Sequence, residues 1–154
     1  MANAAERPAP ICIVRDGPRR HAEWPLDMRQ VHDSAFNLPE IRLRDRLTRR
    51  TRHFAMSRYP HMLTRVECWT VRAEIQGELV GYAWSYDIAD EHRSAYIDDV
   101  AIFAHHQGRG IGTAIIKEMV AWLHETGIRD ITGMPTNDCM ARIFSRHAIT
   151  PGPR

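Results

Sequence analysis

The chain has 154 residues, 44% of them apolar, and a net charge of +2 at pH 7. This length and apolar content suit one compact domain with a buried core, because two domains would each bury too little surface. No apolar run approaches the roughly 20 residues of a membrane-spanning helix, which excludes that class of protein.

Residues 1–10 are rich in Ala and Pro and lack the apolar stretch of a secretory signal. We expect a disordered lead-in there, a single domain over residues 11–150, a short tail over 151–154, and a cytoplasmic protein. The apolar run 11–15 predicts a strand, and Asp16-Gly17-Pro18 has the composition of a turn that would end it.

Two helices are predicted next, over residues 23–36 and 41–56. Residues 1–66 carry 13 Arg and 7 acidic residues, a net charge of +6, whereas residues 67–154 carry −4. The positive charge is densest in and just after the second helix, at Arg42, Arg44, Arg46, Arg49, Arg50, Arg52 and Arg58. These arginines form either a solvated face or a surface for an anionic acceptor, an acyl carrier protein or RNA, and the sequence does not separate these alternatives.

A hairpin follows, because the β-rich segments 68–74 and 79–86 flank Gln76-Gly77-Glu78. The remaining elements are a polar connector, a strand, a helix ended by Gly127, a strand, and a helix capped by Asn137 or Asp138. Their predicted bounds are 87–93, 94–103, 110–126, 128–134 and 137–147. The order β-α-α-β-β-β-α-β-α predicts an α/β fold with a mixed sheet.

The segment from Gln107 to Gly112 joins the third of these consecutive strands to the longest helix. We expect Gly110 and Gly112 to adopt φ angles that a Cβ would forbid, so that several N–H groups point into one concavity. Such a concavity at a helix N-terminus binds phosphate, and the helix dipole adds an effective charge of roughly +0.5 there. Neither a Rossmann fingerprint nor a P-loop is written in this segment.

The spacing Gln107-x-x-Gly110-x-Gly112 resembles the acyl-CoA pyrophosphate loop of the GNAT superfamily of N-acetyltransferases, and the predicted element order agrees with that family. The resemblance implies that the loop backbone holds the diphosphate of acetyl-CoA or another acyl-CoA. It also implies that the main chain of Val100 and Ile102 pairs with the thioester carbonyl and the pantetheine arm, with Val100 N–H as oxyanion donor. The implied cofactor-binding residues are Val100, Ala101, Ile102, Gln107, Gly108, Arg109, Gly110, Ile111, Gly112, Thr113 and Asn137.

Asp98 and Asp99 are the candidate bases, because two adjacent carboxylates in an apolar strand are costly to bury without a role. Strand alternation places them on opposite faces. The run Tyr96-Ile97-Asp98-Asp99 resembles the acidic strand of polyamine-type GNAT acetyltransferases, in which the first acid serves the amine. That resemblance favours Asp98 as the base, and Asp99 fits better as a structural carboxylate.

The last predicted helix departs from the family pattern. Asn137 fits the position that bonds the cofactor arm, but the position of the tyrosine general acid falls on Phe144, which has no hydroxyl. The chain is then a slower transferase, one that uses Ser145 or water as proton donor, or one with altered chemistry. The family also adds two strands after this helix, which are missing here. The sheet edge is therefore expected to be unpaired and covered by a second copy or a carrier.

Metal chemistry is not expected. Cys12, Cys68 and Cys139 are widely spaced and read as buried apolar residues, and the adjacent His105 and His106 would diverge on extended backbone. The sequence predicts an N-acyltransferase that moves an acyl group, acetyl by preference, from acyl-CoA to a primary amine of a small or carrier-bound acceptor. The alternatives are a weakened acyl-CoA-binding module and an acyltransferase with a carrier-protein or aminoacyl-tRNA donor. Neither a membrane nor a nucleic-acid partner is favoured.

Overall fold

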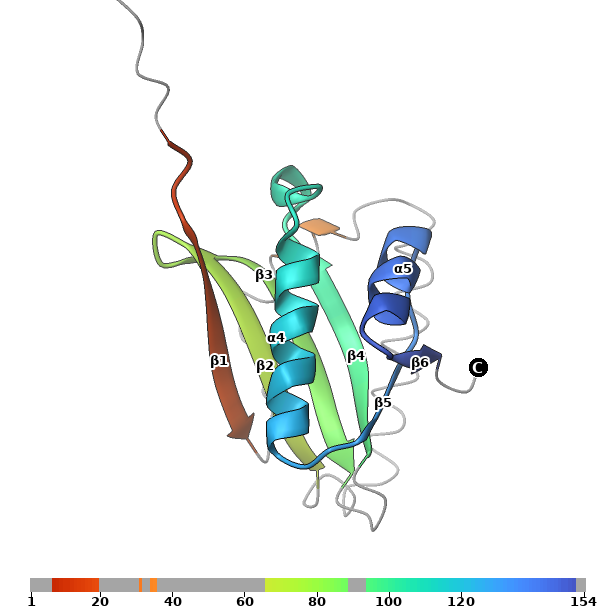
Figure 1. The fold of residues 1–154 in the computed structure, drawn as a ribbon. Coiled ribbons are helices and arrows are strands. Elements are labelled where there is room, and N and C mark those ends of the chain that lie inside the picture. The colour runs from red at the N-terminus through yellow and green to blue at the C-terminus, as the bar shows by residue number, and fades with distance from the viewer. Residues whose placement is uncertain (1–6, 20–30, 32–33, 36–65, 89–93, 152–154) are drawn as a thin grey trace, which may run out of the picture.

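The computed structural model describes residues 7–19, 31, 34–35, 66–88 and 94–151 (Figure 1). Both predicted early helices and the arginine cluster therefore lie outside the described residues, except that Val31, Ser34 and Ala35 are helical. The buried side chain of Val31 packs with Tyr82 and Ala101 in a small apolar cluster.

One mixed sheet of six strands organises the described part of the chain, in the spatial order β1 to β6 (Figure 1). Strands β1 to β4 pair antiparallel, and β5 and β6 then add in parallel. The bounds are β1 Ile11–Arg19, β2 Val66–Ile75, β3 Glu78–Ile88, β4 Ser94–Ile102, β5 Asp130–Gly133 and β6 Thr150–Pro151. The predicted α/β class with a mixed sheet is confirmed.

The turns of the sheet follow the local chemistry with one exception. Gln76 and Gly77 have φ values of 51° and 80°, which suit the two-residue turn of a β-hairpin, and they join β2 to β3 as predicted. The predicted turn at Asp16-Gly17-Pro18 is wrong, because β1 continues to Arg19. The pairing with β2 shifts between Asp16 and Arg19, and Gly17 has a φ of 120°, so these residues form an irregularity within the strand.

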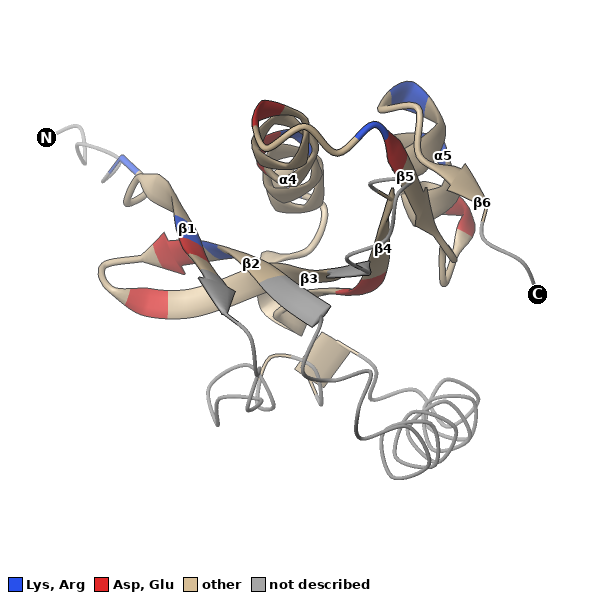
Figure 2. Ribbon diagram, turned by 90° about the horizontal axis from the view of Figure 1, so that it is seen from below, with Lys and Arg blue, Asp and Glu red and all other residues tan. Residues whose placement is uncertain are grey.

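Two α-helices that are described over their full length accompany the sheet. Figure 2 shows α4 (Ile111–Glu125) lying across one face of the sheet, with α5 (Asp138–Arg146) beyond it near β5. The apolar side of α4 is buried in the main core, including Ile115, Ile116, Met119 and Leu123. Gly127, with φ of 89°, donates to His124 O, and Ile128 N–H donates to Leu123 O, which is the Schellman arrangement. The predicted helix and its glycine end are confirmed.

Arg15 ties the edge strand β1 to α4. Its guanidinium is hydrogen-bonded to Glu118, and it donates to the Glu125 carboxylate over 2.6 Å and 3.0 Å. The Arg15 guanidinium also lies 5.5 Å from the centroid of the Trp122 ring. These contacts connect the edge strand β1 to helix α4, which lies far from it in the sequence.

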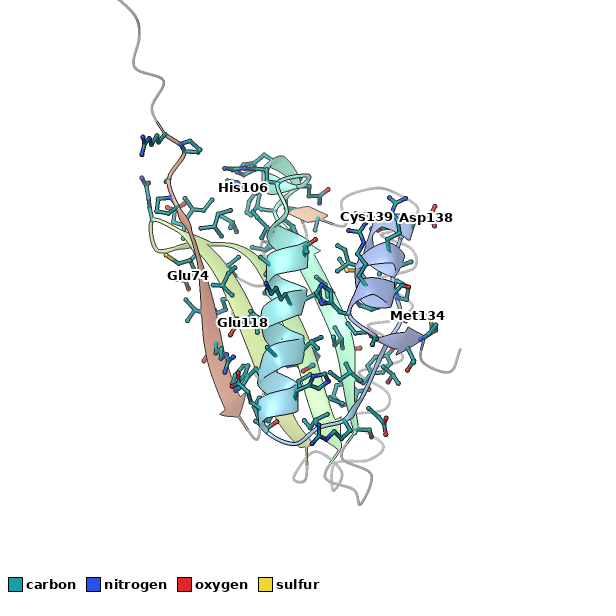
Figure 3. All side chains as sticks on the ribbon, in the orientation of Figure 1. Glu74, His106, Glu118, Met134, Asp138 and Cys139 are labelled. Carbon is teal, nitrogen blue, oxygen red and sulfur yellow. The ribbon has the colours of Figure 1, made fainter. Side chains whose placement is uncertain are left out.

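Two expectations about the ends and the cysteines are corrected. The sheet edge at β5 is not left unpaired, because Thr150 and Pro151 form β6 and pair with Thr132 and Gly133. Cys12 and Cys139 are exposed rather than buried, since Cys12 lies on an edge strand and Cys139 in the first turn of α5. Figure 3 shows Cys139 beside Asp138 at the start of that helix.

Candidate functional site

The site is built where β4 and β5 part. The two strands pair only from Ser94 to Ile97 on β4, opposite Asp130 to Gly133 on β5. Strand β5 ends there, whereas β4 continues to Ile102. Among the described residues, no strand pairs with the β5 side of β4 beyond Ile97.

The main chain of Val100 and Ile102 faces this opening. Phe103 N–H donates to Val80 O over 2.8 Å, toward β3. Because the N–H and C=O groups of an antiparallel strand alternate in direction, those of Val100 and Ile102 point the other way. The Ile102 carbonyl accepts a hydrogen bond there from Gln107 Nε2 over 3.1 Å. Val100 thus presents a main-chain donor and acceptor where β5 has ended.

The glycine loop follows β4 directly and leads into α4. Gly108 and Gly110 have φ values of 75° and 78°, in the left-handed region that favours glycine. Gly110 is the N-cap of α4 without a side-chain cap, and the first intrahelical bond runs from Ala114 N–H to Gly110 O. The N–H groups of Ile111, Gly112 and Thr113 therefore have no acceptor within the helix. Apart from each glycine and its chain neighbours, no atom lies within 4 Å of where a Cβ on Gly108 or Gly110 would stand, so the space beside both residues is open.

The expectation for Gly112 is corrected. Its φ is not in the left-handed region, because it lies within the regular helix α4. A Cβ there would meet Ile143 Cδ1 at 3.8 Å and Met140 Cε at 3.9 Å, which are ordinary contacts. Gly108 therefore has the conformational role that the sequence reading gave to Gly112.

The side chains of the loop also differ from expectation. His105 and His106 do not diverge, because they lie in the 3-10 turn η1 (Ala104–His106) with ring centroids 4.2 Å apart. Arg109 Nη1 lies 2.9 Å from His106 Nδ1. Partial burial, followed by the charges of His105 and Arg109, lowers the pKa of His106 below its ordinary 6.5. In the sequence, only the separation of three residues between His106 and Arg109 could have indicated that their side chains meet.

The two acids of β4 lie at a β-bulge. Opposite β3, Trp84 pairs with Asp99 and Ser85 with Ile97, so Asp98 is an extra residue. Ile97 and Val100 both pack in the core under α4, although strict alternation would separate them. The bulge therefore breaks the alternation between Ile97 and Val100, and alternation alone no longer supports the expectation that Asp98 and Asp99 face opposite sides.

The face of the sheet opposite α4 combines the carboxylate of Asp99 with aromatic rings. Asp99 is 6% exposed and accepts a hydrogen bond from the Tyr82 hydroxyl over 2.6 Å. The Tyr86 ring lies 5.5 Å from Tyr96 and 6.3 Å from Trp84. Neither the bulge nor this aromatic row was visible in the sequence, because both depend on the register between β3 and β4.

Helix α5 places the remaining predicted residues. Asn137 is its N-cap, and its Oδ1 accepts from Met140 N–H over 2.8 Å, so only the amide nitrogen is left for a ligand. Phe144 is buried, and its ring covers Gly133, where an added Cβ would stand 2.8 Å from Phe144 Cε2. Gly133 pairs with Ile97, so this ring sits at the point where β4 and β5 part. Ser145 is exposed and does not share the buried side of α5.

The described residues offer neither a metal centre nor a membrane-spanning helix. They contain no group of three or more His, Cys, Asp or Glu that could hold a metal ion. Within the same part of the chain, no helix is long and apolar enough to cross a membrane.

Residues 27–145 match the model of the acetyltransferase (GNAT) family. This chain belongs to the GNAT family. A putative GNAT acetyltransferase from Desulfovibrio desulfuricans is 19% identical, with a TM-score of 0.58 over 89% of this chain and 83% of that one. An aminoglycoside acetyltransferase from an uncultured soil metagenomic sample is 18% identical, with a TM-score of 0.60 over 94% and 90%.

A third GNAT-like structure, an aminoglycoside N-acetyltransferase in complex with CoA, is 12% identical, with a TM-score of 0.59 over 98% of this chain and 95% of that one. At these identities the likeness shows the fold. A search of curated proteins gave no match.

GNAT proteins use acetyl-CoA, and the site fits such a molecule. The open space beside Gly108 and Gly110 and the first-turn N–H groups of α4 suit an anionic diphosphate. The main chain of Val100 lies on the strand that leads into this loop, so it suits the amide-bearing arm of the same molecule.

Proposed function

We propose that this GNAT protein is an N-acyltransferase. It transfers an acyl group, acetyl by preference, from acyl-CoA to a primary amine on a small or carrier-bound acceptor. The observation that supports the proposal is that two sets of main-chain donors follow each other in the chain: those of β4 on its β5 side, and those of the glycine loop with the first turn of α4. The outward-facing groups of β4 run directly into the glycine loop and the first turn of α4.

The main chain supplies binding and electrostatic stabilisation. Bound acyl-CoA would bring an activated acyl group as a thioester. The loop residues Gln107 to Thr113 would hold its diphosphate, with Ala101, Ile102 and the Asn137 amide nitrogen along its arm. Val100 N–H would donate to the thioester oxygen, where negative charge develops during attack.

Asp98 is the proposed base. It would accept the proton that the amine loses as nitrogen bonds to the acyl carbon and the carbon–sulfur bond breaks. Asp99 holds Tyr82 in the core and is assigned a structural role. Phe144 cannot donate a proton, so the leaving thiolate would take one from water or from the exposed Ser145.

The test compares Asp98→Asn with Asp99→Asn in acetyl transfer to a panel of primary amines. Asp98→Asn should lower kcat/KM by about 10²- to 10⁴-fold, because a positioned base contributes that much, while the Kd for CoA stays unchanged. Asp99→Asn should mainly lower stability. Equal activity of Asp98→Asn and the wild type would remove Asp98 from this role.

The nature of the acceptor is a finer proposal. The arginine-rich segment, which lies outside the described residues, favours an acceptor that carries a carboxylate or phosphate, or a carrier protein. Neutralising Arg49, Arg50 and Arg52 together should then raise the KM for the amine. Unchanged kinetics would contradict an anionic or carrier-bound acceptor.

We also propose that the protein is cytoplasmic and that it self-associates through the β6 edge of the sheet.

A second candidate function is favoured by Phe144. A GNAT domain without the hydroxyl could be a weakened acyl-CoA-binding module. Phe144→Tyr separates the two functions. A gain of turnover in this variant, together with CoA binding but no transfer by the wild type, would favour the binding module. A carrier-protein or aminoacyl-tRNA donor is the remaining alternative, and tight binding of acetyl-CoA would count against it.

A further inference from the structure

Besides its main-chain N–H groups, the glycine loop has a side-chain contact between His106 and Arg109. Arg109 Nη1 lies 2.9 Å from His106 Nδ1. A guanidinium has only donors and stays protonated, so Nδ1 must be the acceptor. His106 is therefore neutral in this contact, with its proton on Nε2.

His106 is itself anchored to the end of β4. Its ring lies 4.2 Å from that of His105, which in turn meets Phe103 edge-on at 4.6 Å. Phe103 follows β4 directly, and a hydrogen bond from its N–H group to Val80 O holds it in place. Figure 3 shows His106, the last residue of η1, at the end of the molecule where α4 begins.

Arg109 lies between Gly108 and Gly110 in the glycine loop. Gly108 and Gly110 on either side have left-handed φ values, and the Arg109 side chain is exposed. An exposed arginine loses rotamer freedom when it binds a ligand. The contact with His106 has already restricted that freedom, so less is lost when an anion binds.

We propose that His106 is a positioning residue that acts through Arg109, holding the guanidinium at the rim of the glycine loop for the phosphates of an acyl-CoA. The inference rests on the proposed function, because it assumes that this loop binds a phosphate-bearing cofactor. His106 touches no reacting atom and is not a catalytic residue.

A double-mutant cycle tests the inference by calorimetry with CoA. His106→Ala and Arg109→Ala should each raise the Kd by about 3- to 10-fold, the range expected for an ordinary hydrogen bond in an exposed loop. The double variant should bind no more weakly than Arg109→Ala. His124→Ala, at the exposed far end of α4, is the matched control and should bind like the wild type.

Two further measurements separate positioning from a general structural role. His106→Asn should restore affinity, because its amide oxygen can accept where Nδ1 did. His106→Ala should raise the KM for acetyl-CoA with kcat unchanged, since it removes uniform binding. Thermal melting identifies any variant that fails to fold, and His106→Leu, which keeps the bulk of the side chain but removes the acceptor, then replaces His106→Ala in the cycle.

The outcomes distinguish the proposed function from the role proposed for His106. If the wild type binds no CoA, the proposed function fails. If the wild type binds CoA but His106→Ala binds equally well, the inference alone is wrong. It is also wrong if His106→Ala weakens binding as much in the Arg109→Ala background as in the wild type.

Discussion

Gly110 and Gly112 stand two residues apart but require glycine to different degrees. Gly110 has a φ of 78°, which costs an L-residue with a Cβ roughly 1–2 kcal/mol. Gly112 is helical, and alanine is favoured over glycine in a helix by about 0.5–1 kcal/mol. Two glycines of one motif can therefore differ in whether replacement by alanine lowers or raises stability.

The first prediction is that Gly110→Ala lowers stability and weakens CoA binding, whereas Gly112→Ala raises stability by up to about 1 kcal/mol and leaves CoA binding unchanged. The added methyl group at Gly112 meets only ordinary contacts with Met140 and Ile143. Urea unfolding and calorimetry on both variants give the measurement. Weaker CoA binding by Gly112→Ala than by Gly110→Ala would contradict the geometry.

The second prediction concerns the titration of His106. Burial, His105 and Arg109 lower its pKa below the ordinary 6.5, so the unfolded chain takes up this proton first. The contribution of His106 to stability therefore falls as the pH drops from about 6.5 to the lower pKa of the folded state. NMR titration of the ring should show the low pKa, and Arg109→Ala should raise it. A wild-type value above 6.5 would exclude the described contact.

At the scale of elements, β1 is held by side chains as well as by β2. The Arg15 hydrogen bond lowers the pKa of Glu125 below its ordinary 4.5. A carboxylate with a lowered pKa stabilises the fold above its unfolded value, and this contribution is lost as the pH falls through the folded value.

The third prediction is that Arg15→Met lowers the melting temperature at neutral pH and low salt. The difference from the wild type should shrink in 1 M salt and below about pH 4.5, because the ion pairs are exposed and depend on ionised carboxylates. Lys117→Met, at an exposed position of the same helix, is the control and should melt like the wild type. A salt-independent loss would show that Arg15 acts by packing on Trp122 instead.

At the scale of the whole molecule, the sheet has one short edge strand. Strand β6 has only two residues, which pair with Thr132 and Gly133 of β5. The Thr150 hydroxyl also donates to Ile131 O over 3.4 Å, but no residue of β6 pairs with Asp130. Partly uncovered strand edges readily pair with other chains.

The fourth prediction is that the protein forms a dimer through this edge, which sedimentation velocity measures over a range of concentrations. Removing the β6 pairing by truncation after Ile149 should shift the association constant, whereas a change at the opposite edge, such as Cys12→Ser, should not. A monomer at high concentration would overturn the dimer proposal.

Elements whose signals are local could be predicted from the amino-acid sequence. The hairpin at Gln76 and Gly77, the apolar side of α4, the end of α4 at Gly127 and the Asn137 cap all follow from neighbouring residues. The family also followed from a loop motif and an element order, which are properties of the chain alone.

Only the tertiary structure decided the features that depend on register and on contacts between distant segments. The bulge at Asp98, the partner of Asp99, the strand at Thr150 and the ring contact of His105 with His106 each require a particular alignment in three dimensions. A strand's alternation can be read from its residues, but an inserted bulge residue reverses it. Which residue is inserted is fixed by the pairing with β3 and the core under α4.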